Sequence, residues 1–324
     1  MSLSRSASIF AGLVLLFQGL SAPLLRADNK AAYTALQFGK VDQAASLLHS
    51  ALAENPADAE AHQLLCRAAL AQNLADDAIQ ECRKAVQYAP SDSDDYMWLG
   101  RALGMKASHS NPIAAINIAK EVRAAFERAV ECDGTNVYAL SDLGEYYVAA
   151  PAFLGGSPDK ARQLAATLQP RSPMRAHRIL ALLAQKENDL TTAETEFKLA
   201  ISSDGSPEAY ADLALFYQKN KIRDKVGPAV VAAMQADRAH GPVEVDAASI
   251  LIAAKLSPDV AERALRNYLS SGQQSDSAPS FKAHLALGKL LAARGDKEGA
   301  RQEYTAAAAL APSYVPAQKA LRSL

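Results

Sequence analysis

The sequence has 324 residues, with 34 basic and 35 acidic side chains, and is long enough for two ordinary domains. This balanced charge argues against nucleic acid as the main partner, which would favour a basic stripe. Three cysteines are too few for a disulfide scaffold, and the scarcity of alternating β-branched runs predicts essentially no sheet.

The stretch from Met1 to Ala27 has the pattern of a secretory signal peptide. A single positive charge at Arg5 precedes an apolar run, and small residues follow it. Cleavage after Ser21 or Ala27 fits this pattern and predicts an exported protein, periplasmic or secreted. The alternative is an uncleaved anchor, because Ser8 to Leu25 is about long enough to span a bilayer. Polar residues and a proline inside that stretch favour cleavage.

A set of fixed spacings recurs along the rest of the chain, residues 28–324, and is clearest near the C-terminus. Between Phe281 and Ser313 the spaced residues are Gly288, Gly295, Ala300, Tyr304, Ala307 and Pro312. Two apolar stripes of helical period flank a Gly-Asp turn, and a proline ends the second helix. The small residue at the start of the set, here Gly288, lets two antiparallel helices approach closely. Because one helical hairpin cannot bury both its faces, the pattern predicts a stack of hairpins.

The same spacings recur upstream, starting at Ala32, Cys66 and Ala181, and Pro56 and Pro90 stand 34 residues apart. The predicted repeats cover 26–92 (two repeats), 94–134, 138–173, 174–205, 207–238, 243–269 and 281–313. The third has its second helix ten residues late and the fourth has a five-residue insertion, so we expect a long second helix in the third. A short closing helix over the last repeat is expected from Pro316 to Leu321.

These spacings resemble the tetratricopeptide repeat (TPR), whose period is 34 and whose pattern reads W-x2-L-G-x2-Y…A-x3-F…P. Trp98-Leu99-Gly100 and Leu143-Gly144-Glu145-Tyr146-Tyr147 show its first half most visibly. The resemblance covers about residues 26–324 and is loosest in repeats six and seven. It implies an all-α fold, a right-handed α-solenoid of about eight TPR-like hairpins with a C-terminal capping helix.

The resemblance also implies a binding groove, which in this family is lined by the first helix of each hairpin. The residue after the small position and the residue three before it lie one helical turn apart and form a stripe. The predicted binding residues on this stripe are Tyr33, Arg67, Met97, Arg101, Glu145, Arg178, Leu182, Leu215 and Ile250. Arg67 and Arg101 suit a partner segment that bears carboxylates, whereas Leu182 to Ile250 is largely apolar. The alternative is a solvated face followed by ordinary packing.

The cysteines and histidines allow more than one interpretation. Cys66 and Cys82 would face each other across one hairpin, either as a disulfide in an exported protein or as two small core residues. Three histidines share the position four before the small residue, in repeats that are not consecutive. We therefore expect semi-buried packing rather than a metal site, and no cofactor. These histidines are His62, His177 and His284.

No H-E-x-x-H, C-x-x-C or G-x-S-x-G motif occurs, and no catalytic residue is predicted. The expected function is non-catalytic binding of a protein or peptide in the cell envelope, without stable membrane insertion after leader cleavage. Two alternatives are a carrier of an apolar ligand and an enzyme built from the inserts of repeats three and four. His109, Asp159 and Lys160 are the polar candidates for that enzyme. Gly155-Gly156, before a helix start, is interpreted as a turn rather than an anion site.

Overall fold

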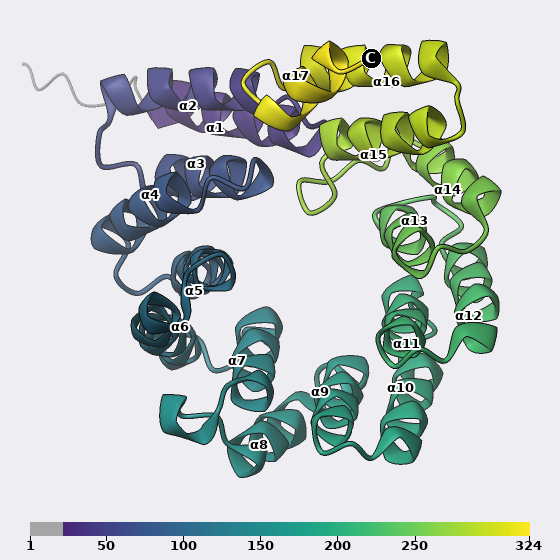
Figure 1. Cartoon of the computed structure of the whole chain (residues 1–324). Helices are drawn as coiled ribbons and strands as arrows, with labels where there is room; N and C mark the ends of the chain where they lie inside the picture. Colours follow the sequence, from purple (N-terminus) through teal and green to yellow (C-terminus); the bar gives the residue numbers. More distant parts are fainter. Residues whose placement is uncertain (1–21) are drawn as a thin grey trace, which may run out of the picture.

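The computed structural model describes residues 22–324, and this part of the chain is helical almost throughout (Figure 1). Its only β-structure is an isolated bridge between Ser275 and Ala278. Most of the predicted leader lies outside the described residues and stays a prediction. The helices are α1 (Ala22–Gln37), α2 (Val41–Glu54), α3 (Ala59–Ala71), α4 (Ala75–Tyr88), α5 (Ser93–Ser108), α6 (Pro112–Cys132), α7 (Val137–Ala149), the 3-10 turn η1 (Ala152–Leu154), α8 (Pro158–Leu168), α9 (Pro173–Lys186), α10 (Leu190–Asp204), α11 (Pro207–Lys219), α12 (Arg223–Ala236), α13 (Val243–Ala254), α14 (Pro258–Ser270), α15 (Ser280–Ala293), α16 (Lys297–Leu310) and α17 (Val315–Arg322).

Helices α1 to α16 pair into eight antiparallel hairpins that stack side by side as a right-handed α-solenoid, and α17 follows the last hairpin. This confirms the predicted fold class. The small positions explain the close pairing. A Cβ placed on Gly288 of α15 would lie 2.5 Å from the ring of Tyr304 on α16, so only hydrogen fits there. Ala32 and Ala181, at the equivalent positions of α1 and α9, are fully buried.

The turn inside six of the eight hairpins shows the register of the repeat, and the exceptions are repeats three and four, which carry the insertions. The backbone is left-handed (positive φ) at the residue seven after the small position, where Gly and Asn are best tolerated. These turn residues are Gly39, Asn73, Asn188, Lys221, Lys255 and Gly295. The predicted stripe takes the residue that follows the small position. Because Ile250 was placed on the stripe, the prediction made Ser249 the small residue of repeat seven. That register was wrong by one, because Lys255 marks Ala248 as the small residue, and Ala248 is buried whereas Ser249 is exposed.

The insertions of repeats three and four behave as the sequence predicts. Helix α6 is the longest in the described part of the chain, with 21 residues, and the Asn111 side chain caps it by accepting from the Ala114 N–H at 3.0 Å. Ser157 caps α8 in the same way. Gly155 and Gly156 form a turn, because their N–H groups donate to the carbonyls of Ala152 and Pro151 and are not free for an anion.

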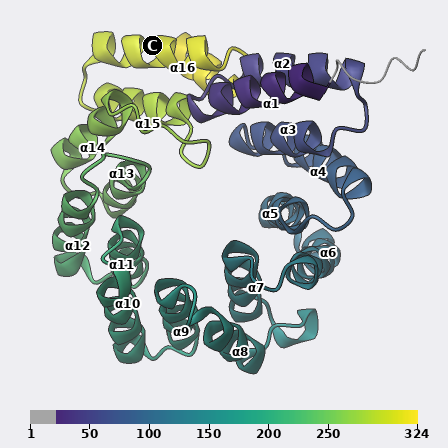
Figure 2. The ribbon, with the colours of Figure 1, turned by 180° about the vertical axis from the view of Figure 1, so that it is seen from behind.

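The solenoid closes on itself, which the sequence did not predict. Figures 1 and 2, seen from opposite sides, show the first hairpin beside the last. At this seam the Ser313 backbone N–H donates to Asp42 at 3.1 Å and Lys282 donates to Asn73 at 2.9 Å. The apolar core continues across the seam, since one cluster of buried side chains includes residues of α1 and α3 and of α15, α16 and α17. The repeats therefore form a ring, with the first helix of each hairpin on the inside.

A largely buried ion pair joins the two sides of the seam. Arg67 of α3 donates through Nε at 2.8 Å to Asp276, in the segment between α14 and α15, although 209 residues separate the two in sequence. A double-mutant cycle with Arg67→Ala and Asp276→Ala is expected to give a coupling free energy of about 1 kcal/mol in urea unfolding. Only a closed ring brings these residues into contact, so a coupling near zero would show that the ring is open in solution.

Candidate binding surface on the inner face

The predicted stripe lies on the inner helices, but its arginines are not free. Arg67 bonds Asp276, and its guanidinium lies 5.0 Å from the ring centroid of Tyr33 and 4.8 Å from that of Trp98. Arg101 donates through Nε to Asp142 at 2.6 Å and also lies over Trp98. The expectation that Arg67 and Arg101 await a partner's carboxylates is therefore not met, because the chain supplies both carboxylates itself.

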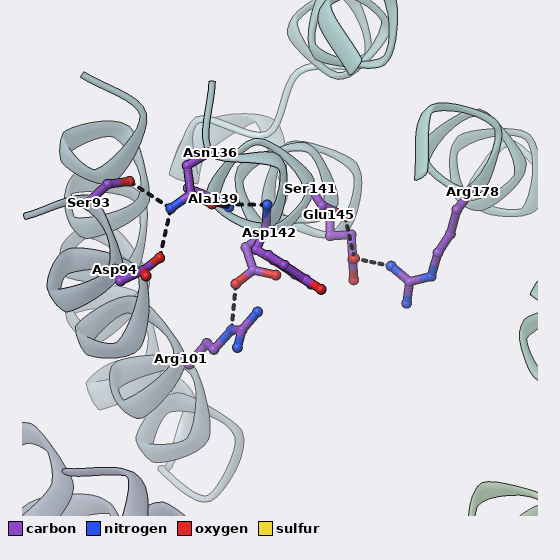
Figure 3. Close-up of polar contacts among 10 residues, drawn as sticks. Ser93, Asp94, Arg101, Asn136, Ala139, Ser141, Asp142, Glu145 and Arg178 are labelled. Carbon is purple, nitrogen blue, oxygen red and sulfur yellow. Dashed lines mark hydrogen bonds and ion pairs between the residues drawn. The ribbon is translucent and has the colours of Figure 1, made fainter. Parts of the chain in front are cut away.

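Glu145 and Arg178, also on the predicted stripe, bind each other. Figure 3 shows Arg101, Asp142, Glu145 and Arg178 reaching between neighbouring inner helices. The Arg178 guanidinium bonds Glu145 of α7 on one side and Asp212 of α11 on the other, the latter at 2.8 Å. Burial alone would lower the pKa of Arg178, yet the two carboxylates hold it above its usual value. Arg178 therefore links repeats four, five and six through ion pairs and is held in place on both sides.

An open groove of about 540 Å³ follows on the inner face, between α9, α11 and α13. Its lining residues are Met174, Arg175, Arg178, Glu208, Ala211, Asp212, Leu215, Gln218, Asp246, Ser249, Ile250 and Ala253. Three predicted residues, Arg178, Leu215 and Ile250, thus meet at one place. The other predicted apolar residues do not line this groove: Leu182 is half-buried against the core, and Met97 is buried with Ala129 and Ala139.

The three histidines are held by glutamates of the second helix. His62 Nδ1 lies 2.6 Å from Glu81, and His284 Nδ1 lies 2.6 Å from Glu303. His177 makes the same contact with Glu196 at 2.8 Å. The partner always stands 19 residues later, a spacing that is visible in the sequence but was not among the predicted features. Within residues 22–324 no group of three or more His, Cys, Asp or Glu side chains is placed to hold a metal ion.

Comparison with known sequences agrees with this architecture. Tetratricopeptide-repeat family models match residues 35–99 and residues 253–315, which are the two sides of the seam.

The chain carries tetratricopeptide repeats.

Among solved structures, yeast Tom70 shares the fold of this chain. Yeast Tom70 aligns with a TM-score of 0.54 and 16% identity over 96% of this chain and 65% of that chain. A thermophilic TPR protein of Thermus thermophilus aligns with a TM-score of 0.48 and 20% identity over 70% of this chain and 99% of that chain. The present chain thus spans slightly less than two thirds of Tom70. A search of curated proteins found no match.

The polar residues suggested for an enzyme do not converge on one place in the TPR array. His109 at the end of α5 shares a shallow pocket with Asp76 and Asp77 of the previous repeat. Asp159 pairs with Arg162, and the Lys160 ammonium lies over the ring of Tyr147. No hydrogen bond or ion pair links His109 to Asp159 or Lys160 in the described structure. No helix among residues 22–324 has the length and apolar character needed to cross a membrane.

Asp246 in the groove is expected to destabilise the TPR array at neutral pH. Withdrawal from water and the like charges of Asp212 and Glu208 raise its pKa from 3.8 to about 6. The folded state therefore binds the proton of the Asp246 carboxyl more tightly than the unfolded state does. Protonated Asp246 contributes its full stabilisation below about pH 4, and this stabilisation is lost as the pH rises through 6. Asp246→Asn should therefore raise Tm at pH 7 more than at pH 4. Equal changes at the two pH values would contradict the raised pKa.

Proposed function

We propose that this TPR protein is a non-catalytic scaffold that binds a protein or peptide on the inner face of its ring. The observation that carries the proposal is the groove between α9, α11 and α13, where apolar side chains from three repeats form a floor. Met174, Ala211, Leu215 and Ile250 contribute to that floor. Elsewhere on the inner face the predicted residues Arg67, Arg101 and Glu145 are already paired with other side chains of the same chain, so the groove is the part of the stripe most accessible to a partner.

Crosslinking in the native cell envelope, followed by identification of the captured protein, tests this function. Leu215→Glu places a charge on the groove floor and should abolish capture. Leu199→Glu is the matched control, because Leu199 is an exposed leucine on the outer helix α10. Equal capture by wild type and both variants would exclude the groove as the binding surface.

We also propose that the protein is an exported bacterial protein that acts in the periplasm or outside the cell. Two features support this: the leader pattern of Met1 to Ala27 and the disulfide between Cys66 and Cys82, a bond that persists in oxidising compartments. Fractionation and N-terminal sequencing should find a mature chain that begins between Ala22 and Asp28. An intact N-terminus in the cytoplasmic fraction would overturn export.

A carrier of an apolar ligand is the second candidate, favoured by the same groove floor. Delipidated protein should then take up an apolar dye, and Leu215→Glu should prevent the uptake. Absence of uptake by the wild type would leave only the scaffold.

A further inference from the structure

Three aspartates occupy the same position on the inner face, two residues before the small residue of repeats four, six and seven. These are Asp142, Asp212 and Asp246, counted from Gly144, Ala214 and Ala248. Asp142 receives the guanidinium of Arg101, and Asp212 receives that of Arg178. In both cases the arginine comes from the preceding repeat. The inner face therefore uses this position to hold a cation.

Asp246 lacks that cation. Arg101 stands one after the small residue of its repeat, and Arg178 stands three before the small residue of its own. The corresponding positions of repeat six are Leu215 and Ala211, both of which line the groove beside Asp246. Among the described residues no hydrogen bond or ion pair reaches the Asp246 carboxylate, which lines the groove, partly withdrawn from water by the groove walls but still accessible from it.

The other charges around the groove do not replace the missing cation. Arg178 is committed to Glu145 and Asp212. Arg175 also lines the groove but forms no ion pair in the described structure, and its guanidinium lies 4.4 Å from the ring centroid of Tyr138 on α7. Glu208 adds a second carboxylate without an ion pair in the described structure.

We propose that the groove binds a partner segment through a guanidinium or ammonium side chain that pairs with Asp246, while an adjacent aliphatic side chain packs on Leu215 and Ile250. This deepens the proposed function and rests on it. The partner's cation takes the place that Arg101 and Arg178 fill for the two equivalent aspartates. The charge complementarity favours a basic partner, because Asp246 and Glu208 form no ion pair in the described structure, whereas Arg178 is already paired with two carboxylates.

Binding of three labelled nonapeptides to the purified full-length protein, measured by fluorescence anisotropy, tests the proposal. Each has acetylated and amidated ends and Gly-Ser spacers, and the central Leu-X-Leu carries arginine, uncharged citrulline or glutamate. The arginine peptide is expected to bind about tenfold more tightly than the citrulline peptide, which corresponds to about 1.4 kcal/mol. Equal binding of these two, tighter binding of the glutamate peptide, or no binding of any peptide would overturn the proposal.

Two substitutions test whether the preference for the arginine peptide over the citrulline peptide depends on Asp246. Asp246→Asn should remove the preference for arginine over citrulline. Leu215→Arg recreates the pairing seen between Arg101 and Asp142, so it should remove the same preference and raise Tm. Leu215→Met, which keeps the volume of the floor, should retain the preference. If Asp246→Asn keeps the full preference, the cation binds elsewhere and the proposal fails, whether or not Leu215→Arg folds.

The failure of this proposal can be told apart from failure of the scaffold function. If native crosslinking captures a partner in a manner that depends on Leu215 while the peptides show no charge preference, the scaffold stands and the basic partner is wrong. If the peptides show the preference but the groove captures nothing in the envelope, the site stands and the scaffold function is wrong.

Discussion

Loss of the disulfide between Cys66 and Cys82 is expected to lower the free energy of unfolding by about 3 kcal/mol. The two cysteines join α3 to α4, are fully buried, and lie 16 residues apart in sequence. Closing a loop of that size removes conformational freedom from the unfolded chain, which is the main source of the stabilisation. The double variant Cys66→Ala, Cys82→Ala leaves only alanines, the residue type that fills the small position in several other repeats.

Urea unfolding with and without a reductant measures this effect. Wild type should lose stability in the reductant, whereas the double variant should be insensitive to it. Cys132→Ser serves as control, because Cys132 is the free cysteine and its replacement should leave the response to reductant intact. A wild type that is indifferent to reductant would show that the bond is absent, and one support for export would be lost.

Gly100→Ala is expected to destabilise the protein by about 1–3 kcal/mol, whereas Gly104→Ala in the same helix should stabilise it by about 0.5–1 kcal/mol. A Cβ on Gly100 would lie 2.4 Å from the ring of Phe126 on α6, and nothing lies within 4 Å of a Cβ on Gly104. The same chemical change thus meets a packed helix interface in one case and open space in the other. At Gly104 the substitution makes no new contact, so only the higher helix propensity of alanine changes the stability.

Thermal unfolding of the two variants gives the comparison directly. The double variant Gly100→Ala, Phe126→Leu should be less destabilised than the sum of its single changes, because the smaller side chain relieves the overlap. Equal effects of Gly100→Ala and Gly104→Ala would mean that α5 and α6 do not pack through Gly100.

The hairpins could be predicted from sequence because each is encoded locally. A small residue, a turn residue and a second small residue recur within about one repeat length, and each has a steric cause, as with Gly288 against Tyr304. The register failed only in repeat seven, where Ala247, Ala248 and Ser249 follow one another and any of them satisfies a pattern of small residues. The turn residue settles the register, but a lysine at a left-handed position gives no signal in the sequence.

The site was predicted only in part, because its character depends on contacts between repeats. The stripe identified Leu215, Ile250 and Arg178, which line one groove. It did not show that Arg67 meets Asp276, since Asp276 lies in a polar segment outside any repeat. Nor did it show that Asp246 lacks a cation, since that conclusion needs the corrected register and the pairing of the two equivalent aspartates.

Closure of the ring has a consequence for how the chain folds. Contacts within and between neighbouring hairpins are local, whereas those at the seam join residues separated by 209 to 271 positions. Local contacts form quickly, and distant ones carry the larger entropic cost of loop closure. We expect the hairpins to assemble first as an open crescent and the seam to form last, in a slow first-order phase. A crescent that has not yet closed presents two complementary ends, so at high protein concentration it can close on a second chain and yield a dimer with exchanged seams.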